Sequence, residues 1–213
     1  KDWQVIHRQN RENFETWYPV ALDPLSTTDL LVVAHNGNNT AGLWSFNPDT
    51  KEYGELIYRR SGGDVSTRFH SNRYTSPDVV TAVRYADGRD YRYEWFDGEE
   101  KAIYEQLEGF VAHADRLSIS SRSRDGLSMV VYNVGPRDPG TYYLLKNGRL
   151  QVIGSKMPWF HSDKLADVEA VSYKSRDGKD IEGFITIPNG EPPYPLVVMP
   201  HGGPFFGENP SYD

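Results

Sequence analysis

Short runs of apolar and β-branched residues, separated by turn dipeptides, dominate the hydrophobic pattern of the chain. Clear examples lie at 30–34, 79–85 and 128–132. Asn-Gly or Asp-Gly pairs stand beside such runs at 36–37, 87–88, 97–98, 125–126 and 147–148. These pairs readily adopt the positive φ angles of tight hairpins, so the pattern predicts antiparallel strands joined by short turns. Helical periodicity is nearly absent, and the best helix candidate is the stretch from Asn10 to Tyr18.

An aromatic strand, a turn and a second strand recur three times. The aromatic anchors Trp44, Tyr93 and Tyr142 are 49 residues apart each time. A four-stranded propeller blade needs roughly 40–50 residues, so this period predicts stacked blades. We expect about three blades over 24–155, which are too few to close a ring and indicate further chain. The second strand of each copy is expected at 56–58, 102–104 and 150–153. The polar stretch 61–76 is interpreted as a connection between strands. The aromatic residues of these strands are expected to form the blade core: Trp44, Phe46, Tyr91, Tyr93, Trp95 and Tyr142.

The pattern changes after residue 155. Residues 156–167 are predicted to be a linker, and Val168–Tyr173 and Ile181–Ile187 to form a hairpin around Ser175–Gly178. Leu196–Met199 is wholly apolar, which is typical of a strand buried on both faces of an α/β sheet. The predicted fold class is therefore mainly β: a partial β-propeller over 1–155, the linker 156–167, and the first strands of an α/β domain over 168–213.

The candidate chemistry follows that apolar run directly, in Pro200-His201-Gly202-Gly203-Pro204. A glycine pair at the C-terminal edge of a central strand lets the backbone turn sharply and approach a ligand. A backbone N–H freed by such a turn can stabilise a developing oxyanion, which contributes roughly 2.7–4 kcal/mol in the transition state. An ordinary loop after a strand is the alternative interpretation.

Residues 168–213 resemble the start of the catalytic domain of the prolyl oligopeptidase family of serine peptidases, especially its acylaminoacyl-peptidase and dipeptidyl-peptidase-like branches. The resemblance is carried by the stretches 171–178, 183–188 and 195–204, and 138–143 is similar to the last propeller blade of bacterial members. It implies a β-propeller that covers an α/β-hydrolase domain and admits only small peptides. It also implies a Ser-His-Asp triad that forms an acyl-enzyme, with short peptides or acyl-peptides as substrates.

Three candidate site residues follow from this resemblance. Gly203 matches the backbone donor of the oxyanion hole, Gly202 shapes its turn, and His201 stands where other branches carry a tyrosine whose hydroxyl serves the oxyanion. The chain contains no Gly-x-Ser-x-Gly, and the triad of an α/β-hydrolase lies downstream of the oxyanion loop. We therefore expect a fragment that is inactive alone. A non-catalytic propeller that binds proteins and an esterase of the same hydrolase class remain the alternatives.

Composition narrows the functional classes further. The 213 residues are 38% hydrophobic and 13% aromatic, enough for a buried core, and their net charge of −7 argues against nucleic-acid binding. No apolar run is long enough to span a membrane. Cysteine is absent and the six histidines show no metal-ligand spacing, so no metal or cofactor is expected. Exposed strand edges could pair between copies of the chain, so a homo-oligomer is one possible state. The sequence does not distinguish the bacterial periplasm from the cytoplasm.

Two further motifs have simpler interpretations. Glu99-Glu100 is interpreted as the solvated tip of a hairpin rather than a clamp for a substrate amine. Ser123-Arg124-Asp125-Gly126 and Ser175-Arg176-Asp177-Gly178 repeat one tetrapeptide, and both are interpreted as hairpin turns.

Overall fold

The structure is a computed structural model that describes all residues except 1–2, 10–14, 71–78, 88–89 and 201–213. The chain divides into two compact units. The first covers Lys1–Asp87 and Tyr91–Ile103, and the second covers Gly88–Asp90 and Tyr104–Asp213. The predicted linker at 156–167 lies inside the second unit, and the predicted domain boundary there stays a prediction.

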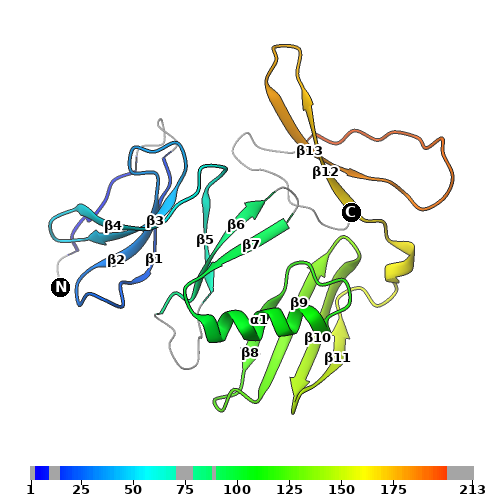
Figure 1. Cartoon of the computed structure of the whole chain (residues 1–213), viewed down its shortest axis with the longest axis horizontal. Helices are drawn as coiled ribbons and strands as arrows, with labels where there is room; N and C mark the ends of the chain where they lie inside the picture. The colour runs from blue at the N-terminus through cyan, green and yellow to red at the C-terminus, as the bar shows by residue number, and fades with distance from the viewer. Residues whose placement is uncertain (1–2, 10–14, 71–78, 88–89, 201–213) are drawn as a thin grey trace. The chain divides into compact units, whose positions relative to one another are not determined.

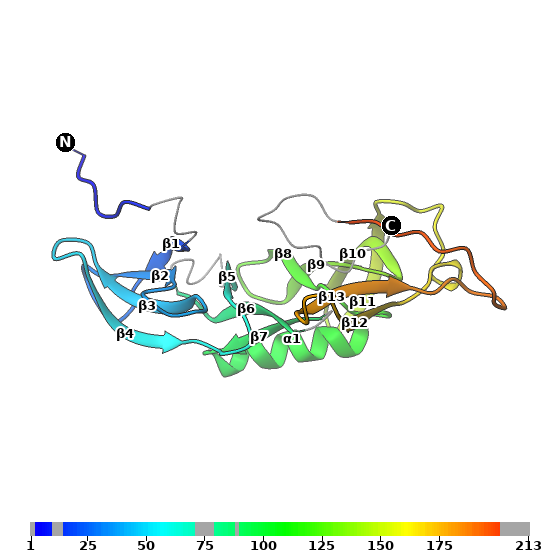
Figure 2. The ribbon, with the colours of Figure 1, turned by 90° about the horizontal axis from the view of Figure 1, so that it is seen from above.

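The first sheet is an antiparallel meander of four strands, as expected for a propeller blade (Figure 1). Its strands are β1 (Trp17–Leu22), β2 (Leu30–Ala34), β3 (Gly42–Asn47) and β4 (Glu52–Tyr58), which lie side by side in chain order (Figure 2). The Asn36-Gly37 pair between β2 and β3 has φ angles of 45° and 73°, which confirms the predicted turn. The helix candidate is wrong where the structure describes it, because Trp17 and Tyr18 begin β1.

A second sheet of the first unit has the order β5-β6-β7, formed by Val65–His70, Ala82–Asp87 and Asp90–Trp95. Strand β5 lies in the polar stretch that we interpreted as a connection, so that interpretation is wrong. The backbone N–H of Val65 donates to the carbonyl oxygen of Ala41 at 3.0 Å. A polar stretch can therefore form a strand here because its start is fixed by an ordered neighbour and its one valine is buried.

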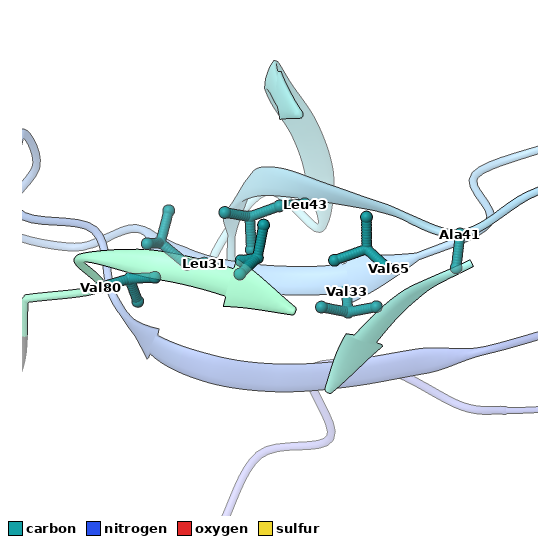
Figure 3. Close-up of a cluster of buried hydrophobic side chains, with 7 residues drawn as sticks. Leu31, Val33, Ala41, Leu43, Val65 and Val80 are labelled. Carbon is teal, nitrogen blue, oxygen red and sulfur yellow. The ribbon is translucent and has the colours of Figure 1, made fainter. Parts of the chain in front are cut away.

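The core of the first unit joins these two sheets. Leu31 and Val33 of β2 pack with Val65 and Val83 of the second sheet in one buried cluster (Figure 3). Val32 and Ala34 alternate with them and face a second cluster with Phe46. The strand β2 is thus buried on both faces, because successive side chains of a strand point to opposite sides.

The second repeat does not contain the return strand that we predicted at 102–104, after Asp97-Gly98. Helix α1 (Gly98–Phe110) occupies these positions. The Asp97 side chain accepts hydrogen bonds from the backbone N–H groups of Glu99 and Glu100 at 2.9 and 3.0 Å, which caps the helix start. Tyr104 and Leu107, three positions apart in α1, are buried on one face of the helix, and Val111 directly after the helix is buried too, so packing also favours the helix.

The second unit contains a four-stranded antiparallel meander with the order β11-β10-β9-β8. Its strands are β8 (Ser118–Arg122), β9 (Ser128–Gly135), β10 (Asp138–Lys146) and β11 (Arg149–Ser155). Asn147 and Gly148 have φ angles of 51° and 70° between β10 and β11, which confirms the predicted hairpin. Buried and half-buried residues alternate along β9, as the period of a strand requires.

After a short 3-10 turn at Ser162–Lys164 comes the hairpin of β12 (Val168–Lys174) and β13 (Asp180–Thr186). Its seven residue pairs run without a bulge from Val168↔Thr186 to Lys174↔Asp180, as predicted from the sequence. The structure is mainly β, which confirms the predicted fold class. In the described part of the chain, no helix combines the length and the apolar character that crossing a bilayer requires.

Candidate functional site

The three predicted site residues, His201, Gly202 and Gly203, lie outside the described residues. Their role at an oxyanion hole therefore stays a prediction. What the structure does describe is the approach to them, from the β12–β13 hairpin to Pro200.

Leu196–Met199, the run that leads into the glycine pair, is not a strand. Its four side chains are 77–81% exposed, and no sheet of the described residues includes it. The prediction of a strand buried on both faces is thus wrong for this chain. An apolar run becomes such a strand only where neighbouring strands accept its backbone hydrogen bonds and cover both faces. This segment consequently gives no structural support to the predicted placement of the oxyanion loop.

Side chains of the turn itself stabilise the turn of the β12–β13 hairpin. The hydroxyl of Ser175 hydrogen-bonds to the Asp177 carboxylate, and the Lys179 backbone N–H donates to the Ser175 hydroxyl oxygen at 3.1 Å. The hydrogen bond from Ser175 lowers the pKa of Asp177 below its ordinary value. The Ser123–Gly126 turn repeats this arrangement, with the Ser123 hydroxyl 2.6 Å from the Asp125 carboxylate. Both tetrapeptides are hairpin turns, as predicted.

A buried polar cluster surrounds Asp138, at the start of β10. Its Oδ1 accepts hydrogen bonds from the Gly140 backbone N–H at 3.0 Å and from the Thr141 hydroxyl at 2.7 Å. Its Oδ2 accepts one from Asn133 Nδ2 at 2.7 Å. Asp138 is 7% exposed and Asn133 is fully buried.

Asn133 completes this cluster by tying β9 to the segment before β8. Its Nδ2 also donates to the His113 carbonyl oxygen at 3.1 Å, and its Oδ1 accepts from the Asp115 backbone N–H at 3.0 Å. Buried polar groups satisfied in this way stabilise a fold, and no oxygen of the cluster is held ready for a substrate proton. We therefore assign the cluster to the architecture of the β9–β10 turn rather than to catalysis.

Gly140 is required beside this cluster. Its φ is +122°, and a Cβ added there would lie 2.7 Å from the Tyr132 hydroxyl oxygen. The Tyr132 ring packs against Tyr142, with centroids 4.7 Å apart, and Lys156 Nζ lies 4.6 Å from the Tyr132 centroid. A hydrogen bond with Tyr132 raises the pKa of Lys156, which is exposed. The stretch 138–143 is thus the first part of β10, where the lack of a side chain at Gly140 leaves room for the Tyr132 ring, which contacts Tyr142 and Lys156.

The remaining candidates are structural in the described residues. Phe46 is 1% exposed and Trp44 donates from Nε1 to the Ala34 carbonyl oxygen at 3.1 Å, so these two aromatics belong to the blade core as expected. Tyr91, Tyr93, Trp95 and Tyr142 are half-buried. No group of acidic or histidine side chains among the described residues is arranged to hold a metal ion.

Glu99 and Glu100 do not form the solvated hairpin tip that we predicted. Both lie in the first turn of α1, and Glu100 is only 7% exposed. The signal that was missed is local: an aspartate followed three residues later by a glutamate is the sequence pattern of a helix start. Two carboxylates at this end are also favoured by the helix dipole.

Comparison with known proteins gives three findings. No family model matches the chain. A dipeptidyl aminopeptidase BIII from Pseudoxanthomonas mexicana is 27% identical over 190 residues, which covers 83% of this chain and 26% of that protein. A solved chain from a structural study of two prolyl endopeptidases superposes with a TM-score of 0.52 at 13% identity, covering 89% of this chain and 26% of that one.

The structural likeness shows the fold, and the sequence likeness adds a relative of named activity. This chain spans about a quarter of the length of each protein. The sequence likeness agrees with the family resemblance found in residues 168–213, and it extends over 83% of the chain. The sequence likeness to a dipeptidyl aminopeptidase supports a relationship between this chain and the prolyl oligopeptidase family of serine peptidases.

Proposed function

We propose that this chain is part of a serine exopeptidase that hydrolyses short peptides or acylated amino acids through an acyl-enzyme. The likeness of 83% of the chain to a dipeptidyl aminopeptidase is the observation that carries this proposal. The order of a meander sheet, a hairpin with a Ser-Arg-Asp-Gly turn and a His-Gly-Gly-Pro loop adds support from the sequence.

In this proposal the chain supplies two parts of the enzyme. The blades restrict access to short substrates. The Gly203 backbone N–H stabilises the oxyanion of the tetrahedral intermediate, Gly202 allows the turn, and His201 flanks the same site. The nucleophile is not among these 213 residues, since no Gly-x-Ser-x-Gly occurs in them, and the chain alone is inactive.

The test compares the 213-residue chain with the protein as its gene encodes it. Each is assayed with a dipeptidyl 4-nitroanilide that has a free amine, an N-acetyl-amino-acid 4-nitroanilide and a 4-nitrophenyl ester, and each is treated with a fluorophosphonate that labels active serines. We expect no turnover and no label for the chain. For the encoded protein we expect labelling of one serine and hydrolysis of at least one anilide.

The other outcomes decide between the alternatives. Turnover by the 213 residues alone contradicts the assignment of roles. Hydrolysis of the ester but of neither anilide favours an esterase. An encoded protein that neither turns over substrate nor reacts with the fluorophosphonate favours a non-catalytic propeller.

A further inference from the structure

Two cations stand directly opposite each other where the β10–β11 hairpin ends. Lys146 is the cross-strand partner of Arg149, and Asn147 and Gly148 make the turn between them. Like charges placed directly opposite on neighbouring strands destabilise the pair. The sequence therefore places an unfavourable pair of like charges at the end of this hairpin.

The β12–β13 hairpin shows the favourable alternative at the same place. Its last pair before the turn is Lys174 and Asp180, whose Nζ and Oδ1 atoms lie 2.6 Å apart. Neither Lys146 nor Arg149 takes part in an ion pair with any of the described residues. Their two positive charges are thus without a counter-ion there, on a chain whose net charge is −7.

A shallow hollow of about 380 Å³ opens on the face of the hairpin that carries both cations. It is lined by Leu144, Lys146, Asn147, Arg149 and Gln151. Leu144 pairs with Gln151 and Lys146 with Arg149, so alternate positions of both strands bring these side chains to one face.

The lining of this hollow matches a peptide better than a free ion. A guanidinium binds a carboxylate through two parallel hydrogen bonds, and an ammonium beside it adds a second charge. The side-chain amides of Asn147 and Gln151 offer donors and acceptors for a peptide backbone. Leu144 supplies an apolar contact that an inorganic anion does not use.

We propose that this hollow binds an acidic peptide segment whose carboxylates pair with Lys146 and Arg149. The partner supplies the negative charge that the opposing strand lacks and so relieves the repulsion between the two cations. This inference does not rest on the proposed peptidase activity.

The test follows backbone amide signals of the 213-residue chain by NMR during titration with a blocked tetraglutamate peptide. Blocked tetraglutamine and inorganic phosphate are titrated in parallel. We expect the tetraglutamate peptide to shift the signals of residues 144–151 saturably, with an affinity that falls as salt is added. Tetraglutamine is expected to cause no saturable shift.

Arg149→Glu and Lys164→Glu change the net charge equally, and Lys164 is an exposed residue of the same unit. Arg149→Glu creates an opposite-charge pair with Lys146, so it should raise the melting temperature while weakening tetraglutamate binding by about tenfold. Lys164→Glu should leave the affinity unchanged. If Arg149→Glu does not fold, Arg149→Gln takes its place, with the same loss expected.

The proposal is overturned if residues 144–151 do not shift, or if both charge variants weaken binding equally. Phosphate binding as tight as that of the peptide would show a site for free anions, and would also overturn the proposal. Loss of peptidase activity in the encoded protein has no bearing on this titration.

Discussion

Asn133 donates a 2.7 Å hydrogen bond from Nδ2 to Oδ2 of Asp138, and the two side chains are buried together at the β9–β10 turn. This pair connects the turn to the segment before β8 through the His113 carbonyl and the Asp115 N–H. A connected set of hydrogen bonds therefore ties the turn to the segment before β8.

Asp138→Ala should lower the free energy of unfolding by about 3 kcal/mol, because it removes the acceptor of three hydrogen bonds, from Asn133 Nδ2, the Gly140 N–H and the Thr141 hydroxyl, the first two in buried residues. Urea unfolding followed by circular dichroism measures the change. Asp163→Ala, at an exposed position, is the matched control and should change the stability by less than about 0.5 kcal/mol. Equal effects of the two substitutions would contradict the role of the cluster.

Gly140→Ala should cost more stability than Gly126→Ala, although both glycines have positive φ. At Gly126, with φ +73°, an added Cβ meets nothing within 4 Å, so only the left-handed backbone costs energy, about 1 kcal/mol. At Gly140 the Cβ also meets the Tyr132 hydroxyl, which should bring the total to about 2–3 kcal/mol. Thermal unfolding of the two variants tests this order, and a reversed order would be inconsistent with it.

Asp97→Ala should weaken the start of α1 by about 1 kcal/mol, because the N–H groups of Glu99 and Glu100 lose their acceptor. Hydrogen exchange of residues 98–103 should become faster. Asp97→Asn keeps a capping oxygen and should leave the exchange close to that of the unmodified chain. Unchanged exchange in Asp97→Ala would mean that packing alone fixes the helix start.

Ser123→Ala should raise the pKa of Asp125, since the hydrogen bond from Ser123 is the main cause of its lowered value. A carboxylate with a lowered pKa stabilises the folded turn above its ordinary pKa, and this contribution is lost as the pH falls through the lowered value. Carboxyl carbon NMR titration measures the effect. The twin turn provides the control: Asp177 should titrate unchanged in Ser123→Ala and shift only in Ser175→Ala.

Much of the fold was predictable because the turns carry their own signal. Asn147-Gly148 adopts positive φ angles and joins the two strands whose apolar residues flank it in sequence. The same local chemistry identified Asn36-Gly37 and the two Ser-Arg-Asp-Gly turns. In each case the residues that specify the turn lie within the turn itself or directly beside it.

The predicted secondary structure was wrong where the local sequence is compatible with more than one element, or where contacts with distant residues determine the element. Ala102-Ile103-Tyr104 is compatible with a strand, and only the Asp97 cap and the buried Tyr104 and Leu107 select a helix. Val65 gave no strand signal in its polar surroundings, and its pairing depends on distant residues. Leu196–Met199 could form a buried strand only with neighbouring strands and covered faces, and the other described residues provide neither.

The candidate site was predicted from a motif rather than from geometry. His201-Gly202-Gly203-Pro204 is a recognisable sequence motif, but the placement of an oxyanion donor depends on the strand before it and on the nucleophile that it faces. Neither dependence is contained in the four residues of the motif.

The proposed role of the Gly203 N–H at an oxyanion hole is tested most directly by the kinetics of the encoded protein with Gly203 replaced in two ways. Gly203→Ala keeps the backbone N–H, whereas Gly203→Pro removes it, and circular dichroism verifies that both variants fold. On the anilide substrate that the unmodified protein hydrolyses, an oxyanion role for the Gly203 N–H predicts that Gly203→Pro lowers kcat by about 10²–10³ relative to Gly203→Ala, with KM nearly unchanged. Equal kcat values for the two folded variants would contradict it.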